Sequence, residues 1–298
     1  MTHIDLHIHS TCSDGKFTPK QIVDEAIKNN VLYFSIADHD TVSAYTDELF
    51  EQLKDKNICL IPAVEISTKF NGVGIHVLGY NIDVTNEFLI KRLYEIRNTR
   101  HIYLEKVTRK LEELGYKVNF EELDKIDAVT KAHIALDIIG NSENEEILKK
   151  NFGHIPTKGE FIETIMNENC PAYVKKESVT PKEASEIIRQ AGGIVVLAHP
   201  VAYSHEDGLD EEDIEKIIDS MEVQGIEAYY IYANRNNVVF NEIERWKKFA
   251  KKHNLFVTIG SDFHEDDGVR PLIGFVKNDF EFSNSDMNDI VKHLTEKK

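Results

Sequence analysis

Two histidines near the start of the chain, His7 and His9, have the spacing of paired metal ligands. They follow Asp5 in the apolar run at residues 4–9, and side chains two residues apart on a β-strand point to the same face. Asp14 comes shortly afterwards in a glycine turn, so a carboxylate is close in sequence to both imidazoles. Imidazole and carboxylate donors suit zinc, manganese or iron. The segment therefore predicts part of a metal site.

Five segments downstream carry similar donors, and each follows an apolar run typical of a buried strand. These segments are Ala37-Asp38-His39-Asp40, Val64-Glu65, Ile75-His76, Ala198-His199-Pro200 and Gly260-Ser261-Asp262-Phe263-His264. In an α/β barrel the carboxyl ends of the strands meet on one face, where the site residues lie. We therefore expect six of the thirteen histidines to converge there.

Strand-like and helix-like patterns alternate in two parts of the chain, residues 1–84 and 179–298. This rhythm favours an α/β fold with a parallel sheet or barrel. The pairs Thr18-Pro19 and Thr180-Pro181 have the composition of helix starts. The expected strands are 4–9, 31–37, 58–66, 73–80, 194–198, 226–230, 256–260 and 273–276, and further helices are expected at 42–54, 210–221, 236–252 and from 285.

Residues 85–178 differ, because their patterns are almost entirely helical. A long amphipathic helix is expected from 86 to 115, with Leu89, Leu93, Leu104 and Leu111 on its apolar stripe and Gly115 at its end. Shorter helical patterns follow it. We interpret 85–178 as a helical subdomain inserted into the α/β domain.

The composition disfavours several classes of protein. The chain has 298 residues, of which 41% are hydrophobic, and this supports a substantial core. Its formal net charge of −17 opposes binding to long duplex DNA. The sequence has neither an apolar run of roughly 20 residues for a membrane helix nor the pattern of a signal peptide. Its three scattered cysteines are typical of a reduced, cytoplasmic protein, and it does not indicate an oligomeric state.

Together, these motifs resemble those of the PHP (polymerase and histidinol phosphatase) phosphoesterases. The resemblance spans the chain and implies a distorted (β/α)7 barrel, with residues 1–84 and 179–298 forming the metal-binding barrel. It also implies two to three divalent metal ions (Mn, Zn or Fe). By motif, the first would be held by His7, His9, Glu65 and Asp262, the second by Glu65, His76 and His199, and the third by Asp14, His39 and His264.

Within that family the chain is most similar to the group acting on nucleoside 3′,5′-bisphosphates and on 5′ ends of short RNA. The shared features are Asp rather than His at position 14, the helical insertion and its Thr130-Lys131-Ala132-His133 segment. The group usually has arginine where this chain has Lys131, and lysine lacks the bidentate fork of arginine. The resemblance implies a hydrolase that cleaves a phosphate ester with a metal-activated hydroxide.

We expect roles for further polar residues. Glu65 would bridge two metals, Asp40 would be a candidate proton carrier, and His199 could be a general acid only if it were not a ligand. Asp5, Asp38 and Asp40 are expected to accept hydrogen bonds from ligand imidazoles. The phosphate-binding candidates, which would make residues 85–178 a substrate cap, are Arg97 and Arg100, three apart on one helix face, with Lys131 and His133.

Other functions are compatible with the same residues. Histidinol-phosphate phosphatase would use the same fold, and a metal-dependent deaminase would share the His-x-His pair and the late aspartate. A PHP module that binds nucleotide without turnover is a further alternative. The leading hypothesis remains a phosphoesterase acting on a small nucleotide or a short RNA 5′ end.

Overall fold

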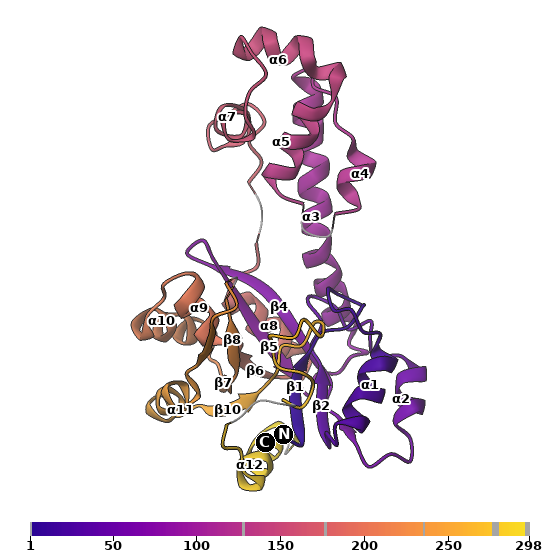
Figure 1. Ribbon diagram of the computed structural model, residues 1–298, viewed down its shortest axis with the longest axis vertical. Helices are drawn as coiled ribbons and strands as arrows, with labels where there is room; N and C mark the ends of the chain where they lie inside the picture. Colours follow the sequence, from indigo (N-terminus) through magenta and orange to yellow (C-terminus); the bar gives the residue numbers. More distant parts are fainter. Residues whose placement is uncertain (1, 127–128, 176–177, 235, 276–279, 296–298) are drawn as a thin grey trace. The chain divides into compact units, whose positions relative to one another are not determined.

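The computed structural model describes residues 2–126, 129–175, 178–234, 236–275 and 280–295 (Figure 1). The chain divides into two compact units, residues 1–94 with 179–298 (unit 1) and residues 95–178 (unit 2). The first boundary falls later than the expected position 84, inside helix α3 (Glu87–Glu113), because the first turns of this helix belong to unit 1. None of the described helices is long and apolar enough to cross a bilayer.

The described strands of unit 1 form three sheets (Figure 1). The first has the order β1-β2-β3, and its neighbouring strands are parallel. The second has five strands in the order β10-β7-β6-β5-β4, and the third pairs β8 with β9. The strands are β1 (Ile4–Ile8), β2 (Tyr33–Ile36), β3 (Cys59–Leu60), β4 (Ala63–Phe70), β5 (Val73–Tyr80), β6 (Ile194–Leu197), β7 (Gly225–Tyr229), β8 (Ile231–Ala233), β9 (Val239–Asn241) and β10 (Phe256–Ile259).

Two isolated bridges link the three-stranded and five-stranded sheets. Ile8 pairs with Phe263, just after β10, and His39, just after β2, pairs with Glu65 on β4. Within the described residues no continuous ladder joins these sheets into a ring. The fold is therefore mixed α/β with a parallel sheet and helices, and the closed seven-stranded barrel stays a prediction.

The strand at β5 departs from the expected parallel arrangement, because it is antiparallel to both β4 and β6. Asn71 and Gly72 separate β4 from β5 with φ angles of 49° and 90°. Two consecutive positive φ angles at Asn-Gly are the signature of a tight hairpin turn. The single strand expected at 58–66 is instead divided into β3 and β4 at Pro62, which has no amide hydrogen for a ladder.

Helices cover the sheets of unit 1. For example, α8 packs on β4, β5 and β6, and α11 packs on β7 and β10. Thr18 and Thr180 cap α1 and α8 through capping boxes, with proline in the first turn of each helix. The helices are α1 (Pro19–Lys28), α2 (Asp47–Leu53), α8 (Pro181–Gln190), α9 (Pro200–Glu206), α10 (Glu211–Met221), α11 (Ile243–Lys252) and α12 (Asn284–Thr295).

Two further expectations for unit 1 were wrong in detail. The helix expected at 236–252 begins only at Ile243, since residues 239–241 form the hairpin strand β9. Residues 273–275 do not form the expected last strand, because Gly274 and Phe275 have φ angles of 76° and 54°. Residue 276, the end of that expected strand, lies outside the described residues.

The described part of unit 2 is helical, as the patterns between 85 and 178 indicate. Unit 2 has its own hydrophobic core. Helix α3 contributes Leu104, Val107 and Leu111 to this core, and Phe161, later in the sequence of the unit, packs in the same cluster. The other helices are α4 (Phe120–Asp124), α5 (Lys131–Gly140), α6 (Glu145–Phe152), α7 (Lys158–Phe161), the 3-10 turn at Ser142–Asn144 and the π-helical turn at Ile162–Met166.

Candidate metal centre

The predicted donors of unit 1 come from strands and from the loops that follow them. His7 lies on β1 and His9 directly after it, while Glu65 and His76 lie on the two strands of the β4–β5 hairpin. The remaining donors follow strand ends, with Asp14 after β1, His39 after β2, His199 after β6, and Asp262 and His264 after β10.

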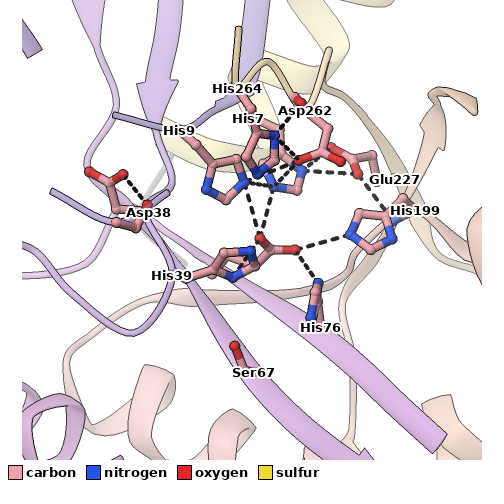
Figure 2. Close-up of polar contacts among 12 residues, drawn as sticks. His7, His9, Asp38, His39, Ser67, His76, His199, Glu227, Asp262 and His264 are labelled. Atoms are coloured by element: carbon pink, nitrogen blue, oxygen red, sulfur yellow. Dashed lines mark hydrogen bonds and ion pairs between the residues drawn. The ribbon is translucent and has the colours of Figure 1, made fainter. Parts of the chain in front are cut away.

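Glu65 is fully buried at the centre of this group. Its Oε2 atom lies 3.2 Å from Nε2 of His7, Nε2 of His9 and Nδ1 of His39. Figure 2 shows these rings converging from different segments of the chain. One carboxylate oxygen thus faces three imidazoles.

The other oxygen of Glu65 faces a different pair. Oε1 lies 3.1 Å from Nδ1 of His76 and 3.1 Å from Nε2 of His199. A hydrogen bond of 2.8 Å from the backbone N–H of His76 to the buried Tyr203 hydroxyl fixes the local backbone. The two oxygens of Glu65 therefore belong to two donor groups, which is the geometry of a bridging carboxylate.

Asp262 completes the first donor group. Its Oδ1 atom lies 3.1 Å from His9 Nε2 and 3.5 Å from His7 Nε2. Its other oxygen accepts a hydrogen bond of 3.0 Å from the Tyr230 hydroxyl. His7, His9, Glu65 and Asp262 hold donor atoms that all lie within 4.8 Å of one another.

Asp14 lies among a third set of donors on the exposed side of the cluster, where 49% of its side chain is accessible. Its carboxylate lies 3.4 Å from His264 Nε2, 3.5 Å from His9 Nδ1 and 3.7 Å from His39 Nε2. The His264 Nδ1 atom is 2.9 Å from the Asp262 carbonyl oxygen, and a hydrogen on Nδ1 leaves the Nε2 lone pair directed toward Asp14.

The donor atoms fit divalent cations. Ligands at about 2.0–2.1 Å from a tetrahedral zinc ion lie about 3.3–3.4 Å apart, close to the separations around Glu65 and Asp262. Glu65 Oε2 is buried and makes no hydrogen bond with the described residues, and neither do the Nδ1 atoms of His9, His39, His76 and His199. Such atoms are costly to bury unless they are satisfied. Cations would satisfy several of them, and the nitrogen and oxygen donors suit zinc, manganese or iron.

The donors of the cluster shift one another's pKa values because they are buried close together. Burial alone would raise the pKa of Glu65 and Asp262, but the surrounding histidines hold both pKa values well below their usual range. Burial, with help from the nearby His9 and His76, lowers the pKa of His39 to about 3. The carboxylates are thus ionised and the His39 ring is neutral near pH 7. Burial alone would lower the pKa values of His7 and His9, but the neighbouring carboxylates raise the His7 pKa well above its usual range and the His9 pKa to about 10. A cation must therefore displace protons from these two rings when it binds.

Glu227 is a member of the site that the sequence analysis missed. It is fully buried on β7, and its Oε1 atom lies 3.0 Å from His7 Nδ1 (Figure 2). Its Oε2 atom accepts a hydrogen bond of 3.0 Å from the backbone N–H of His199. The available signal was a carboxylate inside the apolar run Gly225–Tyr229.

The expectation that Asp5 and Asp38 accept hydrogen bonds from ligand imidazoles was wrong. Asp38 accepts from the backbone N–H and hydroxyl of Ser10, at 2.7 and 2.6 Å. Asp5 accepts from the backbone N–H groups of Ser261 and Gly274 at 3.0 and 2.8 Å, and burial raises its pKa to about 6. Both carboxylates hold loops that carry ligands, since backbone N–H groups in these loops would otherwise be unpaired.

The phosphate-binding candidates of the insertion all belong to unit 2. Lys131 Nζ donates a hydrogen bond of 3.0 Å to Asn167 Oδ1 and lies over the Tyr173 ring. The His133 ring accepts a hydrogen bond from the Thr130 N–H at the start of α5. Arg97 lies on α3, and the side chain of Arg100 is outside the described part. Their roles stay predictions.

A cleft of about 390 Å³ opens onto the donor cluster within unit 1. Its walls include Tyr203, Tyr230, Tyr232 and Arg270, together with several of the candidate metal ligands. The volume falls within the range of about 300–1,000 Å³ typical of small-molecule sites. The cleft therefore gives a small substrate access to the donors.

The PHP domain family matches residues 5–262 of this sequence. The chain belongs to the PHP domain family. It is 29% identical over 87% of its length to a 5′-3′ exoribonuclease of Haemophilus influenzae, covering 89% of that protein. It is 25% identical over 89% of its length to a 3′,5′-nucleoside bisphosphate phosphatase of Chromobacterium violaceum, covering 88% of that protein.

Solved structures share the fold of this PHP chain. A protein from Bifidobacterium adolescentis, described as a metal-dependent phosphoesterase, has a TM-score of 0.63 and 23% identity, with 98% of this chain and 96% of that protein covered. An amidohydrolase from Chromobacterium violaceum has a TM-score of 0.60 and 24% identity, with 90% and 89% covered. The family membership and the buried donor cluster together identify a metal-dependent phosphoesterase.

Proposed function

We propose that this PHP phosphoesterase hydrolyses a phosphate ester of a small nucleotide, either a nucleoside 3′,5′-bisphosphate or the 5′ end of a short RNA. The observation that carries the proposal is the cleft in which Arg270 and three tyrosines border the donor cluster. An arginine can bind a phosphate through two parallel hydrogen bonds, and tyrosine rings can contact a base. The names of the two relatives agree with substrates of this class.

The three donor groups would hold two to three divalent ions, manganese, zinc or iron. When bound, such ions supply Lewis-acid polarisation of the phosphate and a hydroxide near neutral pH. The chain's own contribution is geometric, because Glu65 holds two groups together through its two oxygens. We assign the first group to His7, His9, Glu65 and Asp262, the second to Glu65, His76 and His199, and the third to Asp14, His39 and His264.

Two residues were expected to move protons, and their contacts bear on that role. His199 directs Nε2 toward Glu65, which favours a ligand over a general acid. Asp40 accepts a hydrogen bond of 2.9 Å from the backbone N–H of Ser67, and its own N–H donates to the Glu65 carbonyl. We therefore propose that Asp40 primarily positions β4 and, with it, Glu65.

We further propose that unit 2 is a substrate cap and that its cationic residues bind phosphate. A bisphosphate substrate has two anionic groups, so donors beyond the metal cluster are needed. Lys131 contacts Asn167 and Tyr173, whereas the His133 ring accepts the Thr130 N–H at the start of α5. The full candidate set is Arg97, Arg100, Lys131 and His133.

The test measures phosphate release from adenosine 3′,5′-bisphosphate, adenosine 5′-monophosphate and histidinol phosphate, and release of the 5′-terminal mononucleotide from a short 5′-phosphorylated RNA. We expect the bisphosphate or the RNA to have the highest kcat/KM. Preference for histidinol phosphate would instead establish the alternative phosphatase on the same fold. Replacing Arg270 by alanine should raise KM for the nucleotide about tenfold or more, since a charged hydrogen bond contributes about 1.5–3 kcal/mol.

The matched control for this variant is Lys20→Ala. Lys20 is an exposed cation of unit 1 that pairs with Asp24 on α1, away from the residues that line the cleft. The Lys20→Ala substitution changes the net charge by the same amount as Arg270→Ala and should leave KM for the nucleotide unchanged. Equal effects of the two variants would contradict the assignment of Arg270.

A further inference from the structure

Glu227 contacts His7 and His199, one residue from each of the two donor groups that we assign to Glu65. Both of its oxygens lie within hydrogen-bond distance of His7 Nδ1, at 3.0 and 3.2 Å. Its Oε2 atom also accepts the backbone N–H of His199 at 3.0 Å. Glu227 does not belong to any donor group found among the described residues. It therefore contacts the candidate ligands without being one of them.

The pocket around Glu227 suits a carboxylate. Its two contacts are with a ring nitrogen and a backbone N–H, and an ionised carboxylate is a pure acceptor. A glutamine would direct its amide NH₂ group, which is a donor, at either the His7 Nδ1–H or the His199 backbone N–H, which are donors themselves. The contact between Glu227 and His7 also depends on glycine at position 260, because a Cβ atom there would clash with Glu227 Oε1 and His7 Cβ.

The contact also determines how His7 can act. A proton held on Nδ1 by Glu227 leaves the Nε2 lone pair free, and Nε2 is the atom directed toward Glu65 and Asp262. A carboxylate behind a ligating histidine fixes the tautomer and the ring orientation and makes the ligand more basic.

We propose that Glu227 is a positioning residue that fixes His7 and His199 together and thereby sets the metal affinity of both donor groups. It acts through the ligands and does not touch the substrate cleft, since it is absent from the residues that line the cleft. The inference concerns metal binding, so it stands independently of which nucleotide or RNA is the substrate.

The first experiment measures Zn²⁺ binding to the full chain by calorimetric titration for wild type, Glu227→Gln and the control Glu222→Gln. Glu222 has a largely exposed side chain at the end of α10. We expect Glu227→Gln to weaken Zn²⁺ binding about 10- to 100-fold, as loss of such a partner typically does. The control should bind like wild type. Wild-type affinity in Glu227→Gln would overturn the proposal.

The second measurement separates positioning from general damage to the fold. In ¹H–¹⁵N spectra of the Zn²⁺-loaded protein, the His7 Nδ1–H proton should resonate far downfield in wild type, because a carboxylate accepts its hydrogen bond, and it should move upfield in Glu227→Gln. Glu227→Asp keeps the carboxylate on a shorter side chain and should recover part of the Zn²⁺ affinity. An unchanged His7 Nδ1–H chemical shift in Glu227→Gln would overturn the proposal.

A double-mutant cycle completes the test. If Glu227 acts largely through His7, Glu227→Gln should cost much less Zn²⁺ affinity in a His7→Ala background than in wild type. Fully additive losses would contradict an action through His7. Melting curves of the chelator-treated variants establish that each chain is folded.

Discussion

Replacing Glu65 by glutamine should remove more bound metal than replacing any carboxylate of a single donor group. The substitution keeps the shape of the side chain but removes its charge and converts one oxygen to an NH₂ group. Glu65 belongs to two of the three donor groups, whereas Asp14 belongs to one. Whichever way the amide is oriented, it directs a donor at histidine nitrogens that lie 3.1–3.2 Å away.

The size of the effect follows from linkage between binding and folding. When the free metal concentration is 100 times the Kd of a site, metal binding at that site stabilises the folded chain by about 2.7 kcal/mol. Loss of two such sites therefore costs about 5 kcal/mol. Each kcal/mol shifts the melting temperature of a domain of this size by about 2–4 °C. We therefore expect the metal-dependent part of the melting temperature to fall by about 10–20 °C in Glu65→Gln. Asp14→Asn should lose about half as much.

The assay records thermal melting with excess Mn²⁺ and with chelator, together with metal content by mass spectrometry. The difference between the two melting temperatures isolates the contribution of the metal from any change in the apo fold. Activity on the preferred phosphate ester should fall by about 10³-fold or more, since metal polarisation contributes several kcal/mol. If Glu65→Gln retains as much metal as Asp14→Asn, the bridging role of Glu65 is refuted.

Three further substitutions test other parts of the structure. Gly260→Ala should weaken Zn²⁺ binding and lower stability by about 1–3 kcal/mol, because the new methyl group crowds Glu227; wild-type Zn²⁺ titrations would argue against this. Gly72→Val, at a φ of 90°, should destabilise the β4–β5 turn by about 1–2 kcal/mol in denaturant melts, and an unchanged midpoint would show that the turn tolerates a side chain. Leu111→Ala should cost about 2–5 kcal/mol in the core of unit 2 while leaving metal content intact; loss of metal would show that the two units depend on each other.

The sequence contained the donors of the site because each lies in a short, recognisable segment. His7 and His9 lie at the end of a buried strand and Asp262 and His264 follow another, and the fold brings all four together. This convergence required only the tendency of strand ends in α/β folds to meet on one face. Which donors share which ion is a question of ångström-scale geometry, and spacing alone could not answer it.

The parts that the sequence analysis missed depend on local turns and on partners distant in sequence. The antiparallel β4–β5 pair was signalled by Asn71-Gly72 but was overlooked in favour of the βα rhythm. Glu227 could be noticed as an acid in an apolar strand, yet its contact with His7 spans most of the chain. Asp5 and Asp38 were assigned to imidazoles because backbone N–H partners in distant loops leave no mark in the sequence.

A metal ion in the donor cluster would link β1 to the segment after β10, and these two strands belong to different sheets. Among the described residues, β1 is joined to the segment at the end of β10 by the isolated Ile8–Phe263 bridge, by the hydrogen bond of 2.9 Å from the His9 N–H to the Phe263 carbonyl and by the bond of 3.0 Å from the Ser261 N–H to Asp5. A cation held by His7, His9 and Asp262 would cross-link β1 to the segment after β10 and close a loop that runs from His9 to Asp262 and includes the whole of unit 2. Closing so long a loop restricts the unfolded chain, and its entropic cost grows only slowly with length. Withdrawal of the ion should therefore first appear as faster hydrogen exchange along β1, with the strand loosening before the rest of the sheet.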